Sequence, residues 1–436
     1  MSPSSLAGHL VELLDEIVRT DVPADRIISD FYKQRRYLGS HDRQWISSKV
    51  YGIIRNFILL REVGKECGSD PKSLNIFLLN EILVAKLEPG EIQNIYSQLL
   101  ELYKLAGTEV DLERLSDCSR RKFSELKNSN NDAVLNSFPD FFCEFLPSNV
   151  RDECSLIMDA LNQEAKVCIR VDTARISREE VVVAFWKEGI EVPKSEFSPL
   201  GIYLPKRINL NNVELYKNGT IEIQEEASQL VGLLVDPRKG EVIVDACAGG
   251  GGKSLELASL SFGSSKIYAL DIDKERLENL TERAAKNDYK NITPRVVEDG
   301  SLAGIEDLVG AADKVVIDAP CTGSGTIRRN PDKKFRLTKS YVERKSAYQK
   351  ELLNHYSKLV RVGGSLYYAT CSIFEQENRA VARSFVESNP NFQSVDVSKI
   401  LVEPKFADLI EDGFLAIYPH RTEMDGFFAA VMKRLS

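Results

Sequence analysis

The sequence predicts a multidomain protein with an all-α N-terminal domain, a small α+β connecting domain and a C-terminal α/β domain built on a doubly wound sheet. Helical periodicity fills roughly the first 130 residues. From about Gln224 onward, strand patterns alternate with helix patterns, as a doubly wound sheet requires. We expect the three domains to cover residues 1–133, 134–222 and 223–436.

Apolar residues recur at helical spacing through the N-terminal domain. A helix that begins near Ser40 places four apolar side chains on one face, namely Ile46, Val50, Ile53 and Ile54. Pro89 and Gly90 mark the start of a later helix, whose apolar positions are Ile92, Ile95, Leu99 and Leu102. The polar run of residues 128–132 marks a linker at the end of this domain.

The connecting domain begins with a short apolar helix over Phe138–Leu146. A strand over Val167–Val171 follows, and then a helix whose start carries the capping-box residues Ser177 and Glu180. Two further strands are predicted at Gly201–Leu204 and Ile221–Ile223.

The C-terminal domain contains short apolar runs that predict buried strands. These runs are Val242–Asp245, Lys266–Asp271, Lys314–Asp318 and Ser365–Thr370. A helix that includes Leu352, Tyr356 and Val360 is expected to stop at the glycine pair of residues 363 and 364.

Composition is that of an ordinary soluble globular protein, with 43% hydrophobic and 28% charged residues among 436. No apolar run approaches the roughly 20 residues that a membrane span needs. We therefore expect a cytoplasmic protein with no signal peptide and no membrane partner.

Eight cysteines occur without a C-x-x-C pair, and the four histidines do not cluster near them. The sequence therefore predicts no metal site and no disulfide framework. Five of these cysteines are interpreted as small buried hydrophobic residues, namely Cys67, Cys118, Cys143, Cys154 and Cys168.

A net charge of −8 argues at first against a nucleic-acid partner. Residues 328–350 are nevertheless strongly basic. Such runs are more often solvated helix faces, but this one follows a cysteine motif closely. The candidate contacts to RNA phosphate are Arg328, Arg329, Lys333 and Lys334.

A glycine cluster follows the strand that ends at Asp245, where backbone amides and a helix N-terminus can approach a cofactor. The candidate cofactor-binding residues here are Cys247, Ala248, Gly249, Gly250, Gly251, Gly252 and Lys253. A Walker A loop is disfavoured because Cys247 stands where its first glycine belongs. A dinucleotide fingerprint fails because Ser254 replaces its third glycine.

Two acidic residues follow the next two strands. Asp271 ends a strand at the position where a carboxylate can accept both ribose hydroxyls of a nucleoside cofactor. Asp299 follows a further strand of the domain, which lies between the runs Lys266–Asp271 and Lys314–Asp318. Either residue alone would more often be a turn residue, but their order after the glycine cluster makes both candidate cofactor ligands.

Two cysteines follow the ends of two other strands, in Asp318-Ala319-Pro320-Cys321 and in Thr370-Cys371-Ser372. Neighbouring parallel strands end on one rim of a doubly wound sheet. We therefore expect Cys321 and Cys371 to face the same pocket, together with Asp318.

Three ordered motifs carry a resemblance to a known family: DAPCTGSGTIRRNPD over residues 318–332, TCSIFEQEN over 370–378 and PHRTEMDGFFAA over 419–430. The chain resembles the RsmB (Sun) family of RNA cytosine-5 methyltransferases, within the wider RsmB/NOP group. The resemblance implies a class I, Rossmann-like methyltransferase domain with S-adenosylmethionine as co-substrate. It also implies that residues 413–418 and 426–432 form an antiparallel end of the sheet.

The stretch from Ser40 to Arg55 resembles the NusB-type RNA-binding domain of that family. Three positions depart from the family pattern. Gly250 replaces the usual proline of the first motif, Asn330 stands where many relatives have histidine, and Asp172 stands where asparagine is usual.

The resemblance makes Cys371 the nucleophile, makes Cys321 the residue that assists product release, and places Asp318 near both the base and the cofactor. DNA cytosine methyltransferases use the cysteine of a P-C motif instead, so the reverse assignment stays open. The implied reaction is methylation of cytosine C5 in RNA, and we expect 16S rRNA as the partner and a monomeric enzyme. The alternatives are a tRNA methyltransferase and a noncatalytic RNA-binding ribosome assembly factor.

Overall fold

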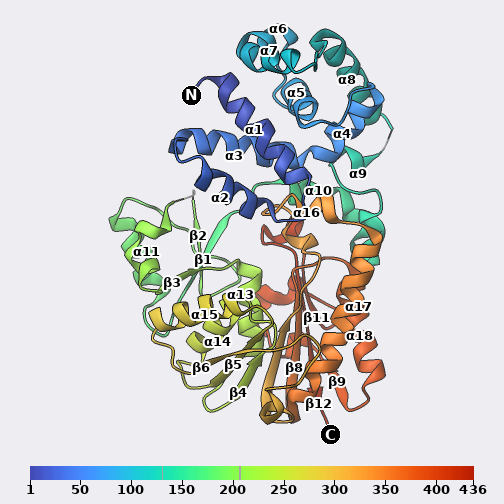
Figure 1. Cartoon of the computed structure of the whole chain (residues 1–436). Coiled ribbons are helices and arrows are strands. Elements are labelled where there is room, and N and C mark those ends of the chain that lie inside the picture. The colour runs from blue at the N-terminus through green and yellow to red at the C-terminus, as the bar shows by residue number, and fades with distance from the viewer. Residues whose placement is uncertain (130, 206–207) are drawn as a thin grey trace. The chain divides into compact units, whose positions relative to one another are not determined.

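The computed structural model describes residues 1–129, 131–205 and 208–436, which form two compact units (Figure 1). The helical unit comprises Met1–Gln163 together with Ile327–Thr338, and the sheet unit comprises Glu164–Thr326 and Lys339–Ser436. The division into three domains with boundaries after residues 133 and 222 stays a prediction, because these units divide the chain at other positions. Asn130, in the predicted linker, lies outside the described residues.

The described residues of the helical unit form helices and no strand. The helices are α1 (Pro3–Val18), α2 (Ala24–Gln34), α3 (Ser40–Arg55), α4 (Phe57–Glu66), α5 (Ser73–Leu83), α6 (Pro89–Ile95), α7 (Ser97–Leu105), α8 (Leu112–Lys127), α9 (Asp132–Leu135), α10 (Cys154–Asn162) and α16 (Lys333–Arg336). Helix α5 is buried over almost its whole length, so the others pack around it. The likeness to a NusB domain stays a prediction.

The helices predicted for this unit are confirmed in part. Helix α3 is confirmed, and its four predicted apolar residues are fully buried. The later helix is two helices, α6 and α7, which meet at Tyr96, and Leu102 is 63% exposed. The apolar helix predicted at Phe138–Leu146 is reduced to a 3-10 turn over Phe142–Phe145.

Four cysteines of the helical unit form disulfides, which contradicts the sequence prediction. Cys67 pairs with Cys118, and Cys143 pairs with Cys154. The sequence pattern missed the first pair because α4 and α8 bring together residues 51 positions apart. Cys168, in the sheet unit, is a buried free cysteine, as predicted.

Lys334 is buried in the helical unit, at 1% exposure. Its Nζ donates to the carbonyl oxygen of Arg55 at 2.9 Å, to that of Asn136 at 3.3 Å and to Asn162 Oδ1 at 2.6 Å. The two carbonyls lie at the C-terminal ends of α3 and α9, where unpaired carbonyls carry partial negative charge, and Asn162 is the last residue of α10. The structure therefore contradicts the prediction that Lys334 contacts RNA phosphate, since its amine is engaged inside the protein.

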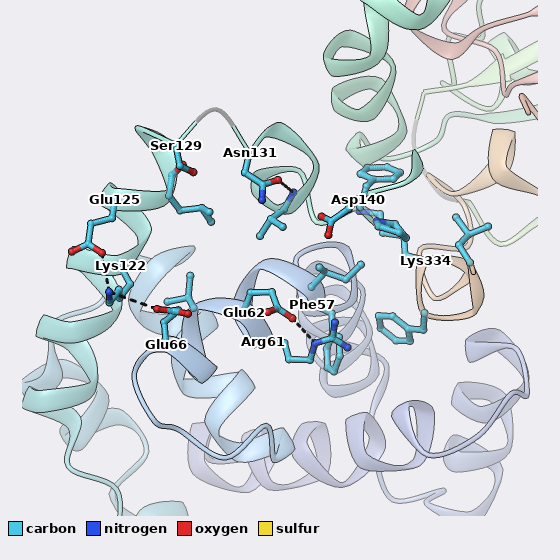
Figure 2. Close-up of a pocket in the computed structure, with 18 of the residues that line it drawn as sticks. Phe57, Arg61, Glu62, Glu66, Lys122, Glu125, Ser129, Asn131, Asp140 and Lys334 are labelled. Carbon is cyan, nitrogen blue, oxygen red and sulfur yellow. Dashed lines mark hydrogen bonds and ion pairs between the residues drawn. The ribbon is translucent and has the colours of Figure 1, made fainter. Parts of the chain in front are cut away.

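A cavity of about 860 Å³ lies beside this segment, and Figure 2 shows its lining from α4, α8 and α16. Two of its cations are paired with acids of the same rim. Lys122 lies 2.9 Å from Glu125 and 3.6 Å from Glu66, and Arg61 lies 3.2 Å from Glu62. The described lining therefore offers no excess of positive charge to an anionic ligand.

The sheet unit contains a small antiparallel sheet of order β2-β1-β3. Its strands are β1 (Val167–Val171), β2 (Gly201–Leu204) and β3 (Ile221–Ile223), and all three confirm the prediction. Helix α11 (Arg178–Lys187) begins with the predicted capping box of Ser177 and Glu180, and α12 (Glu214–Lys217) precedes β3.

The described residues also form a nine-stranded main sheet of order β10-β11-β12-β8-β7-β4-β5-β6, with β9 beside β12. The strands are β4 (Val242–Asp245), β5 (Lys266–Asp271), β6 (Ile292–Val296), β7 (Ala312–Asp318), β8 (Val360–Thr370), β9 (Phe392–Val395), β10 (Ile410–Glu411), β11 (Phe414–Ile417) and β12 (Phe427–Arg434). Strands β4 to β8 pair in parallel, and β12 is antiparallel to β8. The antiparallel end of the sheet is thus confirmed.

Helices cover both faces of this sheet, with α13, α14 and α15 on one side and α17 and α18 on the other (Figure 1). The helices are α13 (Glu226–Val235), α14 (Gly252–Leu260), α15 (Lys274–Lys286), α17 (Lys339–Tyr356), α18 (Arg379–Ser388) and the short α19 (Pro419–Thr422). Of the described residues, no helix has the length and apolar content to cross a membrane.

One boundary in this unit differs from the prediction. Helix α17 ends at Tyr356, and Val360 already belongs to β8. The pairing with β7 shifts register between Ala312 and Lys314. This irregularity, with Gly363 at a φ of +76°, lets the strand run through the glycine pair instead of beginning after it.

We predict that Lys334→Met destabilises the helical unit by at least about 2 kcal/mol, because three oxygens lose the donor that a buried amine supplies. Urea unfolding followed by Trp45 fluorescence in a Trp186→Phe background measures this unit, since Trp45 lies on α3. Lys104→Met is the control, because Lys104 is 60% exposed and its ion pair with Glu109 contributes little. Equal midpoints for the two variants would contradict the prediction.

Candidate active site

The two motif cysteines lie together at the carboxyl ends of β7 and β8. These strands pair in parallel with Asp318 opposite Ala369, so they end side by side. Cys321 Sγ and Cys371 Sγ are 3.3 Å apart. The amide of Gly325 donates to the carbonyl oxygen of Cys371 at 3.0 Å, which ties the two loops together.

The glycine cluster forms the turn from β4 into α14. Gly249 and Gly251 have φ values of +52° and +83°, a conformation that favours glycine. A Cβ at Gly251 would lie 2.1 Å from Leu280, whereas no atom lies within 4 Å of the Cβ position at Gly249 or Gly252. The loop therefore has one packed side and one open side.

Two arginines support the packed side of the loop. Arg170, from β1, donates to the carbonyl oxygen of Gly252 at 2.9 Å. Arg283, from α15, donates to the carbonyl oxygen of Gly250 and lies 2.9 Å from Glu222. These bonds hold the loop at the position where the family has proline.

Lys253 begins α14 and forms an ion pair with Asp318, with Nζ 2.6 Å from Oδ2. Its Nζ also donates to Ser228 Oγ at 3.0 Å and lies 5.2 Å from the ring centre of Phe427. Burial alone would lower the pKa of Lys253, but the Asp318 carboxylate outweighs burial and raises it. In this structure the lysine thus orients and neutralises Asp318.

Both predicted acidic ligands lie at this edge of the sheet. Asp271 Oδ2 accepts from the amide of Gly249 at 2.7 Å, and Oδ1 accepts from the amide of Asp273 at 2.9 Å. Asp299 Oδ1 accepts from the hydroxyl of Tyr348 at 2.8 Å. Tyr348, on α17, was missed because nothing in the sequence relates it to Asp299.

Cys247 lies in the glycine loop and is a further free cysteine of the sheet unit. Burial raises the pKa of its thiol well above the ordinary value, and the carboxylates of Asp245 and Asp318 raise it further. This thiol stays protonated at neutral pH, so it suits a neutral contact in the loop and is unsuited to nucleophilic attack.

Gly426, in the motif of residues 419–430, packs against the Cys321 loop. The amide of Gly426 donates to the carbonyl oxygen of Gly325 at 2.9 Å, and a Cβ on Gly325 would lie 2.1 Å from Gly426 O. Strand β12 then begins at Phe427. Within this motif, a turn at Gly426 thus leads into a core strand.

The predicted RNA contacts fall in the other compact unit. Arg328, Arg329 and Lys333 belong, with Lys334, to Ile327–Thr338 of the helical unit. The carbonyl oxygen of Arg328 accepts from Arg55 Nη2 at 3.3 Å. Phosphate binding by Arg328, Arg329 and Lys333 stays a prediction.

Comparison with known families identifies the sheet unit. The model of the 16S rRNA methyltransferase RsmB/F family matches residues 232–433. The chain belongs to the RsmB (Sun) family. A second model, for the ferredoxin-like domain of RsmF/B-like methyltransferases, matches residues 138–211. The family consists of S-adenosylmethionine-dependent methyltransferases of RNA.

Two curated relatives are bacterial. A probable ribosomal RNA small subunit methyltransferase B of Bacillus subtilis is 33% identical over 270 residues, which are 62% of this chain and 60% of the relative. In that match the chain thus covers three fifths of the relative's length. One from Synechocystis, with the same description, is 25% identical over 95% of both chains.

Two solved structures share the fold. The crystal structure of PH0851 is 26% identical, with a TM-score of 0.80 over 100% of this chain and 99% of that one. NSun6 from Pyrococcus horikoshii, solved with SFG, is 20% identical, with a TM-score of 0.60 over 69% of this chain and 99% of that one.

The residues present fit S-adenosylmethionine. The open side of the glycine loop gives a ligand access to backbone, and the start of α14 favours a carboxylate. Asp271 and Asp299 add hydrogen-bond acceptors at the ends of β5 and β6, which suits the hydroxyls and amino group of a nucleoside.

Asp245, fully buried at the end of β4, should make stability depend on pH. Burial raises its pKa to about 6 from 3.8, and the hydroxyl of Ser254, 2.6 Å away, only partly opposes this shift. The stabilising contribution is therefore complete below pH 3.8 and is lost as pH rises through about 6.

We predict that Asp245→Asn gains stability relative to the wild type as pH rises from 5 to 8, by about 1.4 kcal/mol, because asparagine is neutral throughout. Urea unfolding followed by circular dichroism at each pH measures the difference. Asp288→Asn, at a residue with an 84% exposed side chain, should keep the wild-type pH dependence. Parallel curves for wild type and Asp245→Asn would refute the prediction.

Proposed function

We propose that this protein transfers a methyl group from S-adenosylmethionine to C5 of a cytosine in RNA through a covalent bond between Cys371 and C6 of the base. The observation that carries the proposal is the pair of thiols 3.3 Å apart, beside the Asp318–Lys253 ion pair. Family membership supports S-adenosylmethionine as the co-substrate and RNA as the class of substrate.

The chemistry explains why a thiol pair and an acid are needed. Cytosine C5 is a poor nucleophile, and bonding a thiolate to C6 gives the ring enamine character at C5. Bound S-adenosylmethionine would supply an electrophilic methyl group to C5, and its sulfur would keep the electron pair of the S–CH3 bond that breaks, leaving S-adenosylhomocysteine. The C5 proton must afterwards leave, and the electron pair of its C–H bond re-forms the C5–C6 double bond as the sulfur departs from C6.

Three side chains divide these tasks. Cys371 attacks C6, and Cys321, as its thiolate, accepts the C5 proton and so permits release. Asp318 is assigned to the N3 side of the ring, where a proton carried by its carboxyl group would be donated to N3 as negative charge develops there during thiolate addition. Lys253 keeps the Asp318 carboxyl in place, with Nζ 2.6 Å from Oδ2.

We infer that the substrate is 16S rRNA. The matching family model and the named curated relatives are described by small-subunit rRNA methylation. The target base must be unpaired or turned out of its stack, because C5 and C6 are inaccessible within it. Transfer RNA is the alternative substrate, and a noncatalytic assembly factor is disfavoured by the complete set of Asp318, Cys321 and Cys371.

Labelled S-adenosylmethionine, unmodified 16S rRNA and total tRNA test the substrate. We expect label in 16S rRNA, as 5-methylcytosine at one position, when the product is digested and mapped by mass spectrometry. Label found in tRNA alone would support the proposed reaction but would contradict 16S rRNA as its substrate. A different methylated base would reject the chemistry, and no label in either RNA would favour the assembly factor.

The two cysteines can be told apart by trapping. We predict that Cys321→Ala accumulates a covalent RNA adduct that survives denaturing electrophoresis, because the C5 proton is not removed. Cys371→Ala should lose turnover by at least about a thousandfold and form no adduct. An adduct with Cys371→Ala and none with Cys321→Ala would reverse the roles.

A further inference from the structure

We infer that Glu377 is a positioning residue that sets the distance between the two active-site thiols. The inference rests on the proposed function, because it treats Cys321 and Cys371 as the reacting pair. Glu377 ends a 3-10 turn after the Cys371 loop and is fully buried. Glu377 lies in the TCSIFEQEN motif of residues 370–378, but the sequence pattern predicts no role for it.

Its carboxylate binds both cysteine loops at once. Thr322, the residue after Cys321, donates its amide to Oε1 at 2.8 Å and its hydroxyl to Oε2 at 2.5 Å. Ser372, the residue after Cys371, donates its hydroxyl to Oε2 at 2.6 Å. One carboxylate thus holds the nearest neighbour of each thiol.

Two further residues, on α17 and β8, hold Glu377 in place. Gln349, on α17, donates from Nε2 to Glu377 Oε1 at 3.0 Å and to the carbonyl oxygen of Pro320 at 3.1 Å. Tyr368, on β8, donates its hydroxyl to the carbonyl oxygen of Glu377 at 2.5 Å. These contacts fix the carboxylate, so it constrains the loops rather than following them.

A second set of bonds joins the same loops. Ser324 Oγ lies 2.9 Å from Ser372 Oγ and accepts from the amide of Ile373 at 3.0 Å. Asn378 donates to the carbonyl oxygen of Ser372 at 2.8 Å. Glu377 is central because it alone among these groups offers two oxygens to directional donors from both loops.

The donors named above are amides and hydroxyls, so the carboxylate is held by hydrogen bonds of fixed direction rather than by an ion pair. A carboxylate taken out of water without such bonds would be costly. Its position is therefore specified sharply, and a reaction that needs two sulfurs around one base depends on such a fixed spacing.

The test measures thiol spacing without RNA. With oxidised glutathione as oxidant, Cys321 and Cys371 lose two protons and two electrons and form one disulfide, while glutathione disulfide becomes two thiols. Peptide mapping gives the rate for this pair. We expect Glu377→Ala to slow its formation about tenfold and Glu377→Gln to restore part of the rate, since its amide oxygen still accepts from Thr322.

Glu375→Ala is the matched control, because Glu375 lies in the same turn but pairs with Arg379, 3.3 Å away. It should keep the wild-type rate of disulfide formation. In a Cys321→Ala background, iodoacetamide should alkylate Cys371 at the same rate with and without the Glu377→Ala substitution, which separates spacing from thiol reactivity. Ser372→Ala removes the hydrogen bond between the Cys371 loop and Glu377. It should slow formation of the Cys321–Cys371 disulfide severalfold, and it replaces Glu377→Ala as the test if that variant does not fold.

Methyl transfer supplies a second readout. We expect Glu377→Ala to lower kcat at least about tenfold and to leave the Kd for S-adenosylmethionine unchanged, because the glycine loop is separate from this bridge. Unchanged disulfide rates in Glu377→Ala, or in Ser372→Ala if that variant alone folds, would overturn the inference. If the wild type shows no methylation activity, the proposed function is rejected. The disulfide rates would still test whether Glu377 sets the distance between the thiols.

Discussion

The parallel pairing of β7 with β4 on one side and β8 on the other is the constraint on which the site depends. Residues 243–245 of β4 pair with residues 314–316 of β7, and Asp318 lies opposite Ala369 of β8. Three strands consequently end at one edge of the sheet. The glycine loop follows the first, Asp318 and Cys321 follow the second, and Cys371 follows the third. A slip in either register would separate the thiols from the cofactor loop.

Buried polar groups connect the small sheet to that edge. Arg170 of β1 is 2% exposed and reaches Gly252 O at 2.9 Å, and its Nη1 lies 4.0 Å from the buried Glu256. Gln224 donates to Glu256 at 2.6 Å and completes this network. The connecting segment thus shares hydrogen bonds with the cofactor loop, which explains why it belongs to the same compact unit as the main sheet.

The sequence predicted the strands best, because β1 to β5 are short apolar runs bounded by turn residues. It also placed both cysteines and Asp318 at strand ends, from which their convergence follows. It could not find Tyr348 or the role of Glu377, since their partners are distant along the chain. Lys334 was misinterpreted for a different reason: a basic run has the same composition whether its side chains meet water or cap helix ends. The two disulfides escaped detection because no local pattern marks cysteines that meet only through helix packing.

The helical unit is discontinuous in sequence, because Ile327–Thr338 completes it from within the second half of the chain. During synthesis, helices α1 to α10 leave the ribosome long before Lys334 does, so the oxygens at the ends of α3, α9 and α10 stay without this donor until then. This unit can reach its final state only after the catalytic sheet has been translated through β7. Completion of the helical unit therefore waits for translation of residues 164–326 of the sheet unit, although the helical unit begins at the N-terminus.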